Sequence, residues 1–393
     1  MKIALVLSST PAYSETFFRS KIRGLQISGH QVLLITAKKD VNFDLCEQYV
    51  HPKVYKNKVL QLIMMIKVYL GLSFYIKNVL NYFKSEREEH TPFKRILEKI
   101  YINASLLKLN VDWLHFGFAT MTKDRELVAQ AIGAKMGVSF RGFDINVYPL
   151  KNADCYTKLW KHVDAVHSIS IDLWQKACGL GLLKTTPYQI IAPAVDKSIT
   201  AKEAKVEQGN APVEIITIGR LHYIKGIDLL IETAKRLKDY GLVFKWRIVG
   251  GGDSSDFERY RYHIYQSGLK NIVVLEGKKI HEDSLILLEQ ANLYVQTSYD
   301  EGFCNALLEA QGKGKICIAF NVGGIPENII HGNTGFLVDK VSSDALMSQI
   351  IKTIALPLQE KKTISKNAVN RVKREFTLEN QQQAFLNFYN AFI

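Results

Sequence analysis

The sequence predicts an α/β protein of two Rossmann-like, doubly wound domains that face each other across a cleft. Three observations lead to this prediction. The chain has 393 residues, a length that suits about two to three domains of roughly 150 residues. Apolar runs alternate with helix-length segments from end to end, which is typical of parallel sheets covered by helices on both faces. A polar, charged stretch at residues 201–212 divides this alternation into two series.

The first series, which we assign to a domain at residues 1–200, begins with an apolar strand at Lys2–Leu7. A helix that ends near Gly29 and a second strand at Gln31–Thr36 follow. Later strands are expected near Asp112–Phe116, Gly137–Phe140, Ala165–Ser168 and Gln189–Ile191.

The second series, which we assign to a domain at residues 201–376, repeats the pattern. Residues 377–393 predict a helix at Thr377–Phe392, with Phe385, Phe388 and Tyr389 on one face that we expect to pack in a core. The strands of the second series are expected at Glu214–Gly219, Lys245–Gly250, Asn271–Leu275, Leu293–Thr297 and Ile316–Phe320, and its helices near Ile227–Asp239, Asp256–Ser267, Glu282–Gln290 and Asn305–Gly312.

The composition is that of a globular protein with a large core. Hydrophobic residues make up 47% and charged residues 23% of the chain, which excludes a disordered, collagen-like or coiled-coil protein. The 5 cysteines form no C-x-x-C pair, so neither a disulfide framework nor a cysteine zinc site is indicated. We therefore expect a reducing, cytoplasmic location.

The positive charge is concentrated in the first half of the chain. Residues 1–193 carry 26 Lys and Arg against 15 Asp and Glu, whereas residues 194–393 carry 25 against 23. This asymmetry indicates an anionic partner, either nucleic acid or the phospholipid surface of a membrane, with a merely solvated basic surface as the alternative. Nucleic acid is disfavoured because no basic aromatic ribbon or helix-turn-helix pattern is present.

The apolar segments are too short for a membrane span. Only five apolar residues follow Met1-Lys2, fewer than a secretory signal needs, and Lys67 and Lys77 interrupt the stretch from Val59 to Phe83 well short of about 20 apolar residues. This stretch predicts either an interfacial helix or a long core helix with a lysine edge. An interfacial helix would hold the protein peripherally at the inner face of the plasma membrane.

The candidate chemistry lies where strands of the second domain end. Gly219-Arg220 ends its first strand and Lys225-Gly226 opens the following helix, so two cations that suit a diphosphate lie at one strand end. Gly250 and Gly251, after the second strand, let the backbone approach a ligand. Since they lack G-x-G-x-x-G spacing, a nicotinamide site is disfavoured.

A further pair of charges follows the fourth strand. Glu301 precedes a helix and Glu309 lies two turns further on, while the helix N-terminus offers free amides to phosphate oxygens. Each of these features alone could be a surface charge or a turn. Their occurrence at successive strand ends favours a binding site.

These motifs resemble those of the retaining glycosyltransferases of family 4, which have the GT-B fold, and the resemblance extends over essentially the whole chain. It rests on the G-R-x-x-x-x-K-G signature and on paired glutamates with seven residues between them. The resemblance implies that Arg220 and Lys225 hold the diphosphate of a nucleotide-sugar, that Glu309 contacts the ribose hydroxyls and that Glu301 lies beside the transferred sugar. It also implies that the C-terminal helix crosses back to the first domain, that the amides of Phe303, Cys304 and Asn305 face the phosphates, and that the base sits near residues 277–280, including Lys278 and Ile280.

The first domain resembles the exopolysaccharide and colanic-acid branch of this family. Residues 11–18 look like its P-x-x-S-E-T-F loop, which implies that Ser14, Glu15 and Thr16 lie where acceptor and sugar approach. The same residues also predict a helix start with Ser14 as N-cap. His115 lies in a segment similar to the branch's H-F-G, although a histidine after a strand is often structural.

The clearest departure from the branch is Arg141, which stands where its S-F-H-G-x-D segment commonly has His. A permanently charged, planar guanidinium could bind an anionic sugar or an acceptor phosphate. Asp144, in the same segment, is kept as a site residue. Residues 321–327 look like the family's G-G-x-P-E loop, in which we expect Glu327 to fix the loop rather than to act chemically.

The resemblance implies a retaining hexosyltransferase that uses a UDP- or GDP-type donor and a glycan acceptor, with a lipid-linked oligosaccharide as the preferred class. Attack would occur from the front face or through a covalent intermediate. No D-x-D motif stands out, so we expect neither a metal nor a cofactor. Two alternatives stay open: a nucleotide-sugar 2-epimerase of the same fold, and a non-catalytic nucleotide-sugar-binding assembly protein.

Overall fold

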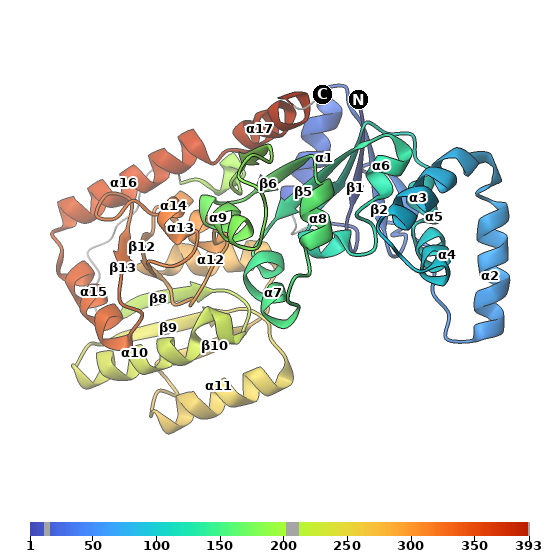
Figure 1. Ribbon diagram of the computed structural model, residues 1–393. Helices are drawn as coiled ribbons and strands as arrows, with labels where there is room; N and C mark the ends of the chain where they lie inside the picture. Colours follow the sequence, from blue (N-terminus) through green and yellow to red (C-terminus); the bar gives the residue numbers. More distant parts are fainter. Residues whose placement is uncertain (12–15, 202–211, 392–393) are drawn as a thin grey trace. The chain divides into compact units, whose positions relative to one another are not determined.

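The computed structural model describes residues 1–11, 16–201 and 212–391 and divides into two compact α/β units (Figure 1). The first unit comprises Met1–Ile191 and Gln382–Ile393, and the second comprises Ala192–Gln381. Each unit has its own parallel sheet, so the prediction of two doubly wound α/β domains is confirmed.

The sheet of the first unit is built from buried apolar strands, as expected for parallel strands covered on both faces. In the described part of this unit it has seven parallel strands: β1 (Lys2–Val6), β2 (Gln31–Thr36), β3 (Glu47–Val50), β4 (Trp113–Phe116), β5 (Lys135–Phe140), β6 (Ala165–Ser168) and β7 (Tyr188–Ile190). They lie in the order β3-β2-β1-β4-β5-β6-β7. The order reverses between β1 and β4, and ligands of such sheets bind at the carboxyl ends beside this reversal. The sequence did not predict β3, whose residues Glu-Gln-Tyr-Val are half exposed and lack an apolar run.

Helices α1 (Thr16–Ile27) and α17 (Leu378–Ala391) cover one face of this sheet. The predicted packing of the C-terminal helix is confirmed, because Phe385, Phe388 and Tyr389 are fully buried against residues of β1 and α1. The other helical segments of the unit are α2 (Lys58–Leu70), η1 (Ser73–Tyr75), α3 (Ile76–Glu88), α4 (Phe93–Ile102), α5 (Ala104–Leu107), η2 (Ala119–Thr122), α6 (Val128–Ile132), η3 (Phe143–Val147), α7 (Tyr148–Lys151), α8 (Thr157–His162) and α9 (Ile171–Gly179).

The apolar stretch from Val59 to Phe83 is not one helix, because it breaks after α2 and continues as η1 and α3. None of the described residues of α2 is buried, so the expectation of a long core helix is wrong for this segment. No single helix among the described residues is long and apolar enough to span a bilayer. Residues 58–70 and 73–88 reach that length and composition only as a pair bent by 56°.

The second unit repeats the doubly wound pattern. In its described part six parallel strands form the sheet: β8 (Val213–Ile218), β9 (Phe244–Val249), β10 (Val273–Gly277), β11 (Leu293–Gln296), β12 (Ile316–Phe320) and β13 (Phe336–Val338). Their order is β10-β9-β8-β11-β12-β13, so the reversal lies between β8 and β11. The sequence predicted all of these strands except β13, which has only three residues.

Alternate residues of the second sheet face two separate cores. Ile215, Ile248 and Val295 contribute to one core, whereas their neighbours Ile216 and Val249 contribute to the other, as the two-residue period of a strand requires. Helices α10 (Ile227–Asp239), α11 (Ser254–Gln266) and α15 (Ser343–Ala355) pack in the first core, and α12 (His281–Gln290), α13 (Asn305–Gly312) and α14 (Ile325–Asn328) pack in the second. The remaining helices are η4 (Lys197–Ile199), η5 (Tyr223–Lys225) and α16 (Leu358–Glu375).

Residues 192–200 group with the second unit, although the sequence placed them in the first domain. The amide of Val195 donates to the carbonyl of Phe376 at 2.9 Å, and the amide of Ala201 donates to Gly312 at 2.8 Å. These backbone bonds tie the segment to α16 and α13. The assignment of acceptor binding to the first domain and donor binding to the second stays a prediction.

Candidate active site

A tight turn after β8 carries Lys225 toward the end of β11. Gly226 has a φ of 62°, and a Cβ atom there would lie 2.0 Å from the carbonyl oxygen of Thr297. The Thr297 hydroxyl donates to the carbonyl of Lys225 at 2.8 Å, and the amide of Tyr299 donates to Ile224 at 2.8 Å. Only glycine fits this close approach without distortion, which explains the Lys-Gly pair in the sequence.

The turn brings Lys225 and Glu301 into contact. The Lys225 ammonium donates to Oε1 of Glu301, which also accepts from the Ser298 hydroxyl at 2.7 Å and the Gln296 amide at 3.3 Å. Burial lowers the pKa of Lys225, but the Glu301 carboxylate outweighs that effect, so the net shift is upward. The result is a fixed ammonium beside a fixed carboxylate at the reversal of the sheet.

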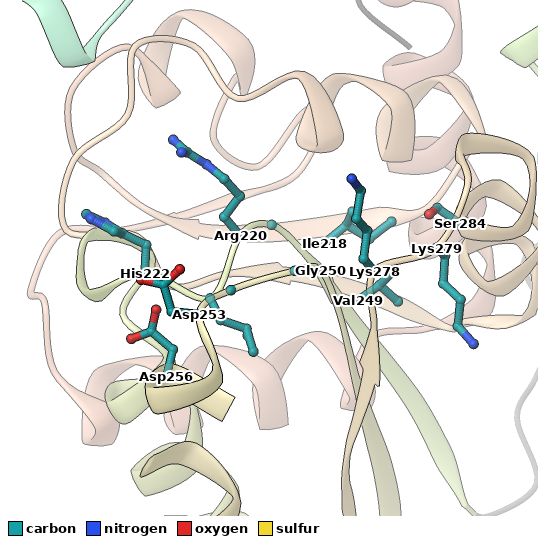
Figure 2. A pocket seen from close by; sticks show the side chains of 14 residues that line it. Ile218, Arg220, His222, Val249, Gly250, Asp253, Asp256, Lys278, Lys279 and Ser284 are labelled. Carbon is teal, nitrogen blue, oxygen red and sulfur yellow. The ribbon is translucent and has the colours of Figure 1, made fainter. Parts of the chain in front are cut away.

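A cavity of about 640 Å³ opens at the carboxyl ends of β8 and β9, and Figure 2 shows its lining. Arg220 and Lys278 project from the strand ends in the same direction, whereas Lys279 points away from them. Of the predicted donor-site residues, the cavity is lined by Gly219, Arg220, Gly250, Gly251 and Lys278. The other lining residues are Ile218, Leu221, His222, Val249, Gly252, Asp253, Asp256, Lys279 and Ser284.

The floor of the cavity depends on close backbone contact between two strand ends. A Cβ atom at Gly250 would lie 1.8 Å from the carbonyl oxygen of Gly219, which leaves no room for a side chain. The amide of Leu221 donates to the carbonyl of Gly251 at 2.7 Å. The side chain of Lys225 lies against the same strand end, since a Cβ atom at Gly219 would be 3.7 Å from Lys225 Cδ. Gly219 therefore lines the cavity and also lies beside the side chain of Lys225, which pairs with Glu301.

Some predicted donor-site residues lie outside the cavity lining. Ile280 is 63% exposed and precedes α12. From the same segment, Lys278 and Lys279 line the cavity. In the second domain, the predicted site residues that do not line the cavity are Lys225, Ile280, Glu301, Phe303, Cys304, Asn305 and Glu309.

The side chain of Asn328 fixes the loop before α13 through two hydrogen bonds. Its side-chain amide donates to the carbonyl of Phe303 at 2.8 Å and to that of Cys304 at 3.0 Å. Cys304 adopts a φ of 72°, unusual for a residue with a Cβ atom, and Asn305 begins α13. Burial, with Glu301 adding to it, raises the pKa of the Cys304 thiol to about 12, so the thiol stays protonated and is a poor nucleophile at neutral pH.

Glu309 pairs with the first residue of α12. Its Oε1 lies 3.0 Å from Nε2 of His281, and this hydrogen bond raises the pKa of His281. The carbonyl of Glu301 accepts from the amide of Gly324 at 2.8 Å, and Arg371 donates to the carbonyl of Glu327 at 2.7 Å. The loop at residues 321–327 thus supports the backbone of Glu301.

In the first unit, His115 lies in the core. Its Nε2 is 2.8 Å from the Ser139 hydroxyl and 3.3 Å from Nζ of Lys21, and the Tyr389 hydroxyl is 2.9 Å from Nδ1. His115 is 1% exposed, and burial, followed by nearby Lys21, holds its pKa well below the ordinary value. This geometry favours a positioning role for His115 over the predicted contact with an acceptor.

Asp144 is also buried and accepts three backbone hydrogen bonds. The amides of Arg141 and Gly142 donate to Oδ1, and the amide of Ala119 donates to Oδ2, each at 3.0 Å. Burial raises the pKa of Asp144 and these bonds oppose the rise. The carboxylate therefore shapes the loop after β5.

The guanidinium of Arg141 lies over aromatic rings. Its Cζ is 3.7 Å from the ring centre of Phe17 and 4.6 Å from that of Phe18, distances typical of cation–π contacts. Thr16 begins α1 next to these rings, and Ser14 and Glu15 lie outside the described residues. The predicted roles of Ser14, Glu15 and Thr16 stay predictions.

Several residues of the site were not predicted from the sequence. Gln296 and Ser298 bind Glu301, and His281 binds Glu309. Polar residues two apart at the end of an otherwise apolar strand were the available signal for Gln296 and Ser298. Over residues 1–11, 16–201 and 212–391, no three His, Cys, Asp or Glu side chains are grouped so that they could hold a metal ion.

Comparison with known proteins identifies the second half of the chain. Residues 198–371 match the family model described as glycosyl transferases group 1. The chain is 27% identical over 302 residues to WcaL of Escherichia coli, named as a colanic acid biosynthesis glycosyltransferase, covering 71% of this chain and 69% of WcaL. It is 26% identical over 256 residues to the amylovoran biosynthesis glycosyltransferase AmsK of Erwinia amylovora, covering 61% of this chain and 60% of AmsK.

The fold has a counterpart among solved structures. HepE of Anabaena, solved in complex with UDP and glucose, gives a TM-score of 0.73 at 17% identity, with 100% of each chain covered. Residues 198–371 are therefore a glycosyl transferases group 1 domain, and the chain is a glycosyltransferase of the GT-B fold that is similar in sequence to the exopolysaccharide biosynthesis enzymes WcaL and AmsK.

Proposed function

We propose that this protein transfers a hexose, with retention of the anomeric configuration, from a nucleoside diphosphate donor to a glycan acceptor. The observation that carries the proposal is the gathering of Arg220, Lys225 and Glu301 where β8 and β11 end. This is the reversal point of the second sheet, the place where doubly wound sheets bind their ligands.

The charges at this point suit the departure of a diphosphate. Cleavage of the bond to the anomeric carbon moves negative charge onto the leaving phosphate, and fixed cations stabilise that charge most strongly in the transition state. Glu301 holds the ammonium of Lys225 in place, and Arg220 carries a permanent charge at the cavity. We assign the diphosphate to these two cations and the transferred sugar to the neighbourhood of Glu301.

The donor is proposed to be of the UDP type, with GDP as the alternative. HepE has the same fold and is solved with UDP and glucose. The cavity of about 640 Å³ lies within the range of roughly 300–1,000 Å³ that small-molecule sites occupy. We propose that Lys278 lies near the base and that Glu309 exchanges His281 for the ribose hydroxyls when the donor binds.

The acceptor is proposed to be a lipid-linked oligosaccharide used in the synthesis of a surface polysaccharide. WcaL and AmsK are named for the biosynthesis of colanic acid and amylovoran. The basic first half of the chain, with 26 Lys and Arg against 15 Asp and Glu at residues 1–193, would attract the anionic inner face of a membrane. We propose that the protein is cytoplasmic and works at that face.

The experiment incubates the full chain with labelled UDP- and GDP-hexoses, with and without extracted lipid-linked oligosaccharides. We expect release of nucleoside diphosphate together with a product whose anomeric configuration, read by NMR, equals that of the donor. Inversion at carbon 2 of the sugar without an acceptor would identify a 2-epimerase instead. Donor binding without either reaction would identify a binding protein.

We also propose that the reaction needs no metal or cofactor. The two cations at the diphosphate provide the charge that a divalent ion would otherwise supply. Turnover should therefore persist in excess EDTA. A loss that magnesium restores would contradict this part of the proposal.

A further inference from the structure

The outer face of α2 is a stripe of exposed aliphatic side chains. Val59 is 69% exposed, Ile63 56%, Ile66 52% and Leu70 71%. At about 100° per residue, these four side chains fall within an arc of about 60° on the helix. Single exposed apolar residues are common, but a contiguous exposed set marks an interaction surface.

The side of α2 opposite the stripe faces the rest of the first unit. It carries the half-buried residues Gln61, Met64, Met65 and Val68. The hydroxyl of Tyr69 donates to the carbonyl of Leu97 in α4 at 2.8 Å, and Figure 1 shows α2 at the edge of the unit. Because the half-buried residues face the unit and the stripe residues are exposed, the stripe points away from its own unit.

The exposed apolar surface continues beyond α2. Phe74 in η1 is 93% exposed, and Ile76 and Leu80, one turn apart on α3, are 55% and 59% exposed. A large aromatic ring with almost no protein contact gains most when it enters an apolar phase.

The charge of this part of the chain is entirely positive. Between His51 and Ser85 the sequence contains six lysines and neither Asp nor Glu. On the helix, Lys58 and Lys67 lie on the two sides of the apolar stripe, where long lysine side chains can extend their ammonium groups toward phosphates. The exposed lysines of this segment are Lys53, Lys56, Lys58, Lys67, Lys77 and Lys84.

We propose that α2, η1 and the start of α3 form a docking surface for an anionic phospholipid bilayer. An apolar stripe edged by lysines is the pattern of a helix that lies in the membrane interface. With 13 residues, α2 is about 20 Å long, shorter than the roughly 30 Å of a hydrocarbon core. It therefore lies along the surface, with Phe74 inserted among the acyl chains.

A second copy of the chain fits this surface less well. A twofold contact would place the surface against itself, which would bring lysines together with no carboxylate in the segment to pair with them. A bilayer of anionic lipid supplies both opposite charge and an apolar phase. The use of this surface to reach a lipid-linked acceptor rests on the proposed function, whereas vesicle binding needs no acceptor.

The test is flotation of the full chain with phosphatidylcholine vesicles that contain or lack phosphatidylglycerol. We expect the parent protein to float with the anionic vesicles. The double variant Ile63→Gln/Ile66→Gln should bind at least about tenfold more weakly, because it removes apolar area from the stripe. The variant Lys67→Gln/Lys77→Gln should weaken binding to the anionic vesicles only.

A matched control replaces two exposed aliphatic residues elsewhere in the first unit, Ile27→Gln/Leu183→Gln, which are 82% and 64% exposed. It should float like the parent. Equal flotation of the stripe variant and the parent would overturn the proposal. Failure of the parent to float, or a parent dimer that Ile63→Gln/Ile66→Gln dissociates, would overturn it as well.

The same samples separate this inference from the proposed function. Melting temperature with and without UDP reports the donor site, and the stripe variant should keep the parent's shift. Donor binding without vesicle binding would overturn only the docking surface. Vesicle binding without any donor binding or turnover would overturn only the proposed function.

Discussion

The ammonium of Lys225 donates to the carboxylate of Glu301, although the two residues lie 76 positions apart in the chain. Lys225 follows β8 and Glu301 follows β11, and these strands are neighbours where the sheet order reverses. The pair thus ties together the two strand ends between which we place the sugar diphosphate.

Lys225→Met should lower turnover by about 10²- to 10³-fold, the usual effect of removing one donor that stabilises a developing anion. It also leaves the carboxylate of Glu301 without its cation, so the melting temperature should be measured on the same sample. Lys235→Met, which removes an exposed lysine paired with Asp239, should leave turnover unchanged. Turnover of Lys225→Met within twofold of the parent would contradict the role of Lys225.

Gly226→Ala should destabilise the second unit by more than about 2 kcal/mol. The substitution adds the cost of a left-handed residue, about 1–2 kcal/mol, to a contact with the Thr297 carbonyl that forces the turn to move. Gly241→Ala is the control, since Gly241 also has a positive φ, 91°, but its Cβ would meet nothing within 4 Å. Urea denaturation should show a larger loss for Gly226→Ala, and equal losses would contradict the close approach.

Glu309→Gln should destabilise the protein more at pH 5 than at pH 9. The pKa of His281 is raised by its hydrogen bond to Glu309, so the folded state binds the proton more tightly than the unfolded state. That stability is fully present below the ordinary histidine pKa of about 6.5 and is lost as the pH rises through the raised value. Because the pair is partly exposed, we expect at most about 1 kcal/mol, and a loss that does not change with pH would contradict the pairing.

Lys21→Met should stabilise the protein more at pH 6 than at pH 9. Burial, with Arg141 adding to it, holds the pKa of Lys21 well below its ordinary value, so the unfolded state binds the proton more tightly. Folding then becomes less favourable as the pH falls below the ordinary lysine pKa of about 10.4, and methionine removes this cost.

The control for this substitution is Lys84→Met, at an exposed lysine of the same unit. The difference in denaturation midpoint between Lys84→Met and the parent should be the same at pH 6 and at pH 9. If Lys21→Met stabilises the protein no more at pH 6 than at pH 9, Lys21 is charged in the folded state and the prediction is wrong.

The sequence predicted the parallel strands and the strand-end motifs because a buried parallel strand is a continuous apolar run and the chemistry follows at its carboxyl end. Arg220, Gly250 and Lys278 indeed line one cavity. Motif spacing left open whether His115 and Asp144 contact a ligand or are buried, because it does not show which backbone amides or side chains form hydrogen bonds with a polar group.

The orientation of α2 also could not be predicted. Its amphipathic pattern allowed the apolar stripe to face either a core or another phase. The structure shows the stripe exposed, while the residues on the other side of the helix are half-buried. Likewise, Ile280 was placed at the cavity from its motif, but the chain turns into α12 there and leaves its side chain exposed.

The measurement that tests the central claim most directly is the melting temperature of the parent protein and of Arg220→Ala with UDP, GDP, ADP and CMP and their common sugar conjugates. Ligands that bind only the folded state raise its apparent stability. We predict that one nucleoside diphosphate, preferably UDP, raises the melting temperature of the parent protein. This rise should be lost in Arg220→Ala. It should be retained in Arg374→Ala, which alters an exposed arginine at the end of α16. No rise with any nucleotide, or a rise that Arg220→Ala leaves unchanged, would contradict the placement of the diphosphate at the end of β8.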